Sequence, residues 1–133
     1  MSISFFRRRE ELPSGCYLTD CAVSGGSLEA FLSSACSAAQ GRLCVRIAPV
    51  YMDFPLPCLG GTGRELSRQE AQELRGNRRL HFSSALCTGY FTDLRQSSLH
   101  LVLFDTRETL QKKLQCCRTA GVPYVLLEGW QAE

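Results

Sequence analysis

A strand–helix–strand pattern between Leu99 and Trp130 limits most strongly what this chain can fold into. The segment opens with the apolar run LHLVLF and closes with the apolar run VPYVLL. Between them, Leu110, Leu114 and Cys117 recur at the spacing of one helical face. A strand that crosses over through a helix into a second apolar strand implies a sheet with at least one covered face. The sequence therefore predicts an α/β fold.

A second unit of the same kind lies nearer the N-terminus. Residues 16–23 and 43–51 read as strands, and Pro49 indicates either the end of the hydrogen-bonded ladder of the second one or a bulge in it. Ser27 is a good N-cap for the helix between them. Apolar residues recur along this helix at i, i+3, i+4 and i+7, and Gly41 ends it. A unit of this order predicts a right-handed crossover.

Two further helix starts are marked by capping patterns. Ser67 and Glu70 have the spacing of a capping box, in which each side chain bonds an otherwise unpaired backbone N–H group. Asp105 and Glu108 have the same spacing and predict the start of the helix within the Leu99–Trp130 unit.

The residues between the two units predict a small α+β insertion. Prolines and glycines make residues 53–63 a predicted loop. Residues 80–83 and 88–93 predict short strands, which form an antiparallel meander because their connections are too short for a parallel crossover. We predict a single domain, 1–133, with a loose N-terminal segment, two βα units and the insertion: residues 1–14, 15–53 with 99–130, and 54–98.

Composition and charge exclude several classes of protein. A hydrophobic fraction of 44% and a charged fraction of 21% are those of an ordinary globular protein. The net charge of +2 gives no reason to expect nucleic acid, and the one compact basic run, residues 7–9, is followed at once by Glu10 and Glu11. No apolar segment is long enough to span a bilayer, and the N-terminus lacks the core of a signal peptide. We expect a cytoplasmic protein with no membrane partner.

Eight cysteines and two histidines carry no metal-binding pattern. No C-x-x-C pair is present, so we expect no metal site, and without an export signal we expect the thiols to be reduced. Redox activity of Cys87 and the pair Cys116 and Cys117 is an alternative to simple packing in the core. The glycine run at residues 60–63 lacks the Lys-Ser/Thr of a phosphate-binding loop, so we expect no cofactor.

A collinear series of segments resembles glycoside hydrolase family 18, notably its spore-cortex and spore-germination members. The stretch IAPVYMDFPLPCLGGTGRELSRQEAQEL is similar to the family segment that follows the seventh barrel strand. GYFTD at residues 89–93 resembles the family's PYFTYTD, and LVLFD at residues 101–105 resembles part of its HxVWFDDxxSxxAKL. Residues 120–127 resemble its last strand. The resemblance implies the last three strands of a (β/α)8 barrel, the family's α+β insertion and a spore-forming bacterial source.

The family's catalytic motif is missing. Its D-x-x-D-x-D-x-E sequence, whose glutamate protonates the leaving oxygen, does not occur in this chain. The family's tyrosine at the end of the sixth strand is absent from residues 18–20, and Trp130 falls two residues later than the family's tryptophan at the end of the eighth strand. The resemblance therefore implies a partial TIM barrel without the proton donor, a pseudoenzyme.

Three parallel strands would leave two open sheet edges. Such edges invite pairing with another chain, so the insertion must fold back over an edge, the protein must dimerise, or a partner protein must supply strands. We expect a homodimer.

Candidate binding residues follow from where the strands end. Functional side chains of barrels sit at the C-terminal ends of strands. A relic saccharide site there would use aromatic platforms and carboxylates, whereas the alternative is ordinary loop polarity. His81 and His100 are expected to be sheet residues rather than acid/base groups. The speculative substrate-binding residues are Asp20, Tyr51, Asp53, Tyr90, Glu128 and Trp130.

Three functions stay open from the sequence. The leading hypothesis is a non-catalytic interaction or saccharide-binding module. The second is a hydrolase of N-acetylglucosamine-containing polysaccharide such as chitin or peptidoglycan, completed by a partner chain and using paired carboxylates. The third is a purely structural homodimer.

Overall fold

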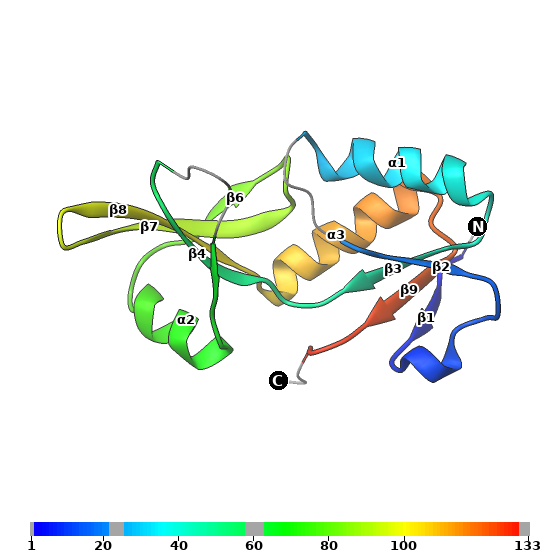
Figure 1. The fold of residues 1–133 in the computed structure, drawn as a ribbon, viewed down its shortest axis with the longest axis horizontal. Coiled ribbons are helices and arrows are strands. Elements are labelled where there is room, and N and C mark those ends of the chain that lie inside the picture. The colour runs from blue at the N-terminus through cyan, green and yellow to red at the C-terminus, as the bar shows by residue number, and fades with distance from the viewer. Residues whose placement is uncertain (1, 22–25, 58–62, 131–133) are drawn as a thin grey trace.

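The computed structural model describes residues 2–21, 26–57 and 63–130, which form two sheets and three α-helices. Figure 1 shows a parallel sheet covered by two helices at one end of the molecule and an antiparallel sheet with the third helix at the other. This is the predicted α/β fold with an antiparallel insertion. No helix in the described residues is both long and apolar enough to cross a bilayer.

The parallel sheet has the strand order β1-β9-β3-β2. The predicted co-directional neighbours β2 (Tyr17–Asp20), β3 (Leu43–Ile47) and β9 (Tyr124–Leu127) do lie side by side. A fourth strand, β1 (Ser4–Phe6), pairs with β9 and lies inside the segment 1–14 that we expected to be loose. The sequence did not reveal β1, because three residues are too few to show an alternating pattern and charged residues follow them at once. A short 3-10 turn follows at Arg9–Glu11.

Helices α1 (Leu28–Ala39) and α3 (Arg107–Ala120) pack together against one face of this sheet (Figure 1). Their apolar stripes meet the strand residues that point toward them, and the side chains in this core include Leu32, Val45, Ile47, Leu114, Cys117 and Val125. Cys117 is fully buried, so its thiol packs as a small hydrophobic group. The predicted cap Ser27 accepts a hydrogen bond from the backbone N–H of Ala30 at 3.2 Å.

The cap of α3 differs from the prediction by one residue. Thr106, not Asp105, is the N-cap, and Thr109 rather than Glu108 completes the capping box. The reason is that the carboxylate of Asp105 accepts hydrogen bonds from the Thr109 hydroxyl, the Val50 N–H and Lys113 Nζ, which leaves the Thr106 hydroxyl to accept from the Thr109 N–H.

The antiparallel sheet has the order β5-β4-β8-β7-β6. The predicted meander strands are confirmed as β6 (His81–Ser83) and β7 (Thr88–Arg95), which pair antiparallel, and β7 pairs in turn with β8 (Ser98–Phe104). Helix α2 (Arg68–Arg75) begins with the predicted capping box of Ser67 and Glu70. The strand β5 (Arg64–Glu65) completes the edge.

Two strand assignments were wrong. The strand that begins near Leu99 is β8, which belongs to the antiparallel sheet. Helix α3 therefore connects the two sheets instead of crossing over within one. Residues predicted as the end of one strand and the start of a loop form β4 (Tyr51–Pro55), which pairs with β8. The break near Pro49 was predicted correctly, because β3 ends at Ile47. Apolar runs look alike in either sheet, so the pattern does not reveal which partner each strand finds.

The face of the parallel sheet opposite the helices is also covered. Cys44 and Leu126 alternate with core-facing residues and so point to this face, yet both are fully buried. Residues 7–16 connect β1 to β2 at the opposite edge of the sheet. Arg9 reaches Glu128 at 3.6 Å, and burial together with the nearby Cys16 thiol raises the pKa of Cys44 to about 11.

The two edges of the parallel sheet find no partner strand among the described residues. The antiparallel sheet is separate and pairs with neither β1 nor β2. Phe5, Tyr17 and Leu18 are exposed on these edge strands. The expected homodimer or partner protein stays a prediction. Sedimentation of the purified chain would measure its oligomeric state.

Candidate functional site

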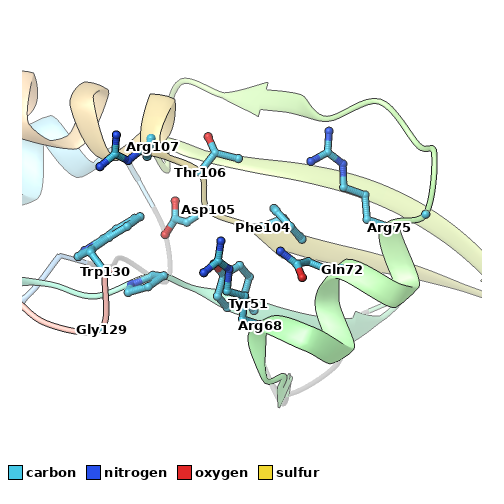
Figure 2. A pocket seen from close by; sticks show the side chains of 12 residues that line it. Tyr51, Arg68, Gln72, Arg75, Phe104, Asp105, Thr106, Arg107, Gly129 and Trp130 are labelled. Atoms are coloured by element: carbon cyan, nitrogen blue, oxygen red, sulfur yellow. The ribbon is translucent and has the colours of Figure 1, made fainter. Parts of the chain in front are cut away.

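A pocket of about 360 Å³ lies where the two sheets meet (Figure 2). It is bounded by the start of β4, by one face of α2, by the start of α3 and by the residues that follow β9. The lining residues are Pro49, Tyr51, Arg68, Gln72, Arg75, Gly76, Phe104, Asp105, Thr106, Arg107, Gly129 and Trp130.

Two of the predicted binding residues, Tyr51 and Trp130, line this pocket together. Tyr51 is the first residue of β4, and its ring meets the ring of Phe104 edge-on at 5.2 Å. Trp130 follows β9, and its indole N–H donates to the carbonyl of Ile47 at 2.9 Å. Each ring is held by a contact of its own, so both aromatic surfaces are positioned before any ligand arrives.

Asp105 is the one carboxylate among the described lining residues, and it is fully engaged. It is only 2% exposed. One oxygen accepts from the Thr109 hydroxyl at 2.7 Å, and the other accepts from the Val50 N–H at 2.8 Å and from Lys113 Nζ at 2.6 Å. All of these groups donate to Asp105, so both of its oxygens are occupied as structural acceptors.

Three arginines and a glutamine also line the pocket, and none of them was predicted as a binding residue. Arg68, Gln72 and Arg75 recur at i, i+4 and i+7, so they share one face of α2, a signal that was readable in the sequence. The guanidinium of Arg75 lies 5.3 Å from the centre of the Phe104 ring and donates through Nε to the carbonyl of Arg78. Arg107 is the first residue of α3.

Asp20 and Glu128 lie elsewhere, in an ion-pair cluster at the C-terminal end of the parallel sheet. Arg46 joins them, with Nε 2.5 Å from Glu128 and Nη1 3.2 Å from Asp20. The hydrogen bond from Arg46 lowers the pKa of Glu128, and Arg9 adds to the effect. A general acid for glycoside hydrolysis needs a raised pKa, so Glu128 is poorly suited to that task.

Asp53 and Tyr90 belong to the antiparallel sheet and do not line the pocket. Tyr90 stands on β7, with its ring 5.5 Å from that of His81. Asp53 is buried beneath Arg95 at 2.7 Å and His100 Nδ1 at 2.9 Å. Burial alone would raise the pKa of Asp53, but these hydrogen bonds outweigh it and lower the pKa.

The lowered pKa of Asp53 predicts an acid-sensitive contribution to stability. Its unfolded-state pKa is about 3.9, so the contribution is complete above that value and is lost as the pH falls through the lower folded-state pKa. We expect Asp53→Asn to destabilise the protein at neutral pH and to flatten the pH dependence below about pH 4. Urea unfolding at neutral and acid pH measures this, with Asp20→Asn as an exposed carboxylate control. An unchanged pH dependence in Asp53→Asn would contradict it.

Within the described residues, no group of three or more His, Cys, Asp or Glu side chains is arranged to hold a metal ion. The thiols of Cys87 and Cys116 do lie 3.2 Å apart. Burial is the main cause that raises the pKa of Cys116 to about 12, and the neighbouring Cys87 thiol adds to it. A raised pKa disfavours the reactive thiolate.

No family model and no curated protein sequence matches the chain, whereas several solved structures do. The spore cortex-lytic enzyme SleL of Bacillus megaterium QM B1551 matches at TM-score 0.65 and 15% identity over 85% of this chain and 30% of its own. The Bacillus subtilis protein ydhD, assigned as a sporulation-specific glycosylase, matches at 0.63 and 14% identity over 84% and 42%. The C-terminal domain of a protein assigned as a chitinase, from Desulfitobacterium hafniense DCB-2, matches at 0.61 and 13% identity over 85% and 40%.

These matches establish the fold. The chain has the architecture of part of these domains and spans less than half the length of each. This agrees with the partial barrel that the resemblance implied.

Proposed function

We propose, from its shared fold with part of these glycosidase-like domains, that this protein is a non-catalytic module that binds a saccharide in the Tyr51–Trp130 pocket. The observation that carries the proposal is the meeting of these two side chains, distant in sequence, in one preformed pocket with an amide and guanidinium groups beside them. Pockets that combine aromatic surfaces with convergent polar groups are typical of small-ligand sites.

The carboxylates of the site support binding without turnover. Glycoside hydrolysis needs a carboxyl group that can donate a proton to the leaving oxygen. Asp105 is buried under three donors, and the pKa of Glu128 is lowered by Arg46. Neither group suits that task, whereas the aromatic rings and hydrogen-bonding groups of the pocket are of the kinds that bind sugars.

The single tryptophan of the chain makes the proposal easy to test. We expect N-acetylglucosamine oligomers to change the fluorescence of Trp130 in a saturable way. Tyr51→Ala should weaken binding by about fivefold, since loss of a well-placed aromatic contact costs on the order of 1 kcal/mol. Tyr90→Ala is the matched control, because Tyr90 is a half-buried tyrosine outside the pocket.

Two results would count against this function. Saturable binding that Tyr51→Ala and Tyr90→Ala weaken equally would place the ligand elsewhere. Release of reducing ends from the oligomers by the purified protein would show turnover, and the module would then be an enzyme.

A further inference from the structure

We propose that the saccharide is an acidic one, bearing carboxylate or phosphate groups, and that it extends from the Tyr51–Trp130 pocket into a second, cationic pocket beside α3. This inference rests on the proposed function and adds the chemical class of the ligand and a second subsite. We call the two adjoining pockets together the basic groove; its cations include Arg75, Arg79, Arg107 and Lys112.

The second pocket has a volume of about 560 Å³ and adjoins the first. Arg75, Thr106 and Arg107 line both, so the two pockets meet along the start of α3. Arg79 and Lys112 line the second pocket alone. A chain of sugars that fills the first pocket therefore has a continuation available on the side where positive charge is concentrated.

The cations of the basic groove differ from most other arginines of this region in their pairing. Arg64, Arg78 and Arg95 each bind a carboxylate, at 3.2 Å from Glu70, 2.6 Å from Asp93 and 2.7 Å from Asp53 respectively.

By contrast, four cations of the basic groove form no ion pair with any described carboxylate: Arg75, Arg79, Arg107 and Lys112. Glu108 is the one described carboxylate in the second pocket, and the charge of Asp105 in the first is matched by Lys113. The net charge of the whole chain is only +2, so this groove holds a local excess of positive charge that would attract anions.

The second pocket also offers an apolar surface next to its charges. Phe82 is 39% exposed, and Lys112 Nζ lies 4.5 Å from the centre of its ring. An acidic sugar matches both features. Its apolar ring face can pack on the phenyl group of Phe82, and its anionic group can bind a guanidinium or ammonium group. Guanidinium groups bind carboxylates and phosphates through paired, charge-assisted hydrogen bonds, and neutral sugars lack the anionic acceptor for them.

A saccharide fits the groove better than nucleic acid does. One end of the basic groove is walled by Tyr51 and Trp130. The rest of the protein brings the net charge back to +2, so the basic surface is local. Nucleic-acid binding draws on a more extended basic face that follows the phosphate backbone.

The test compares ligands of equal length that differ in charge. The probes are the neutral hexamer of N-acetylglucosamine, a hyaluronan hexasaccharide as the carboxylate form, a phosphodiester-linked teichoic acid fragment as the phosphate form, and oligothymidylate. We expect one or both acidic glycans to bind at least tenfold more tightly than the neutral hexamer at low salt, and the difference to shrink as added salt screens the charges.

The variant Arg79→Gln/Lys112→Gln isolates the second pocket. It should remove the preference for acidic glycans, a loss of about tenfold, and leave binding of the neutral hexamer unchanged. Arg118→Gln is the control, because Arg118 is an exposed cation in the last turn of the same helix. The thermal midpoint of each variant verifies that it is folded.

The outcomes separate this inference from the proposed function. Equal binding of neutral and acidic glycans would overturn the acidic ligand and leave the saccharide module standing. Tightest binding of oligothymidylate would overturn it in favour of nucleic acid. Absence of binding by every glycan would refute the proposed function itself.

Discussion

Lys113→Met is expected to lower the free energy of unfolding by about 3–5 kcal/mol, the usual cost of removing one partner from a buried ion pair. Lys113 is 1% exposed and Asp105 is 2% exposed, with Nζ and Oδ2 2.6 Å apart. Without the ammonium group, Asp105 would keep its hydrogen bonds from Thr109 and Val50 but lose the compensating charge. The pair sits where α3, β8 and the chain entering β4 meet, so it also supports the pocket wall.

Urea unfolding of the variant and of a neighbouring control measures this effect. Lys112→Met changes the adjacent, exposed lysine and should stay within about 0.5 kcal/mol of the unmodified protein. The double variant Lys113→Met/Asp105→Asn should recover part of the loss, because neither charge is then buried alone. Equal destabilisation by Lys112→Met and Lys113→Met would show that the ion pair is not the cause.

Phe91→Ala should destabilise the protein by about 3–5 kcal/mol through the cavity that it leaves. Phe91 is 1% exposed on β7 and packs in the core of the antiparallel sheet with its ring 6.5 Å from that of Phe104. Phe104 in turn forms part of the pocket wall and contacts Tyr51. The same substitution should therefore also weaken saccharide binding.

Leu94 on the same strand is the matched control for Phe91. Its side chain is 70% exposed, so Leu94→Ala should change the free energy of unfolding by no more than about 0.5 kcal/mol. The two variants are compared by urea unfolding, and binding is followed by the fluorescence of Trp130. If Leu94→Ala cost as much as Phe91→Ala, the antiparallel sheet would have to bury its opposite face as well, for example against a second chain.

The strand order of the parallel sheet refines the partial-barrel interpretation. The resemblance implied the last three strands of a barrel, but β1 pairs with the free side of β9. In a closed barrel the first and last strands are neighbours, so β1 occupies the place that such a barrel gives to its first strand. Residues 7–16 then lead directly to β2 at the other edge of the sheet.

Features set by neighbours in the chain were predictable. The capping box of Ser67 and Glu70, the cap at Ser27 and the helical stripe of α1 depend on groups within a few residues, and the structure confirms them. The candidate site was half predictable on the same basis. Tyr51 and Trp130 follow parallel strands that end at one edge, so their proximity could be inferred from strand order alone.

Features set by distant partners were not predictable. A lysine at position 113 reads as a solvent-facing charge until the carboxylate of Asp105 is brought beside it. Asp53 resembles a site residue until Arg95 and His100 cover it, and the strand after Leu99 could join either sheet. Spacing along the chain thus predicted the helices and most of the strands, because their hydrogen bonds and apolar faces repeat locally, but not β1 or β4. Which sheet a strand enters, which charges are neutralised and which stay open to a ligand were settled only by packing, because those energies depend on groups that meet on folding.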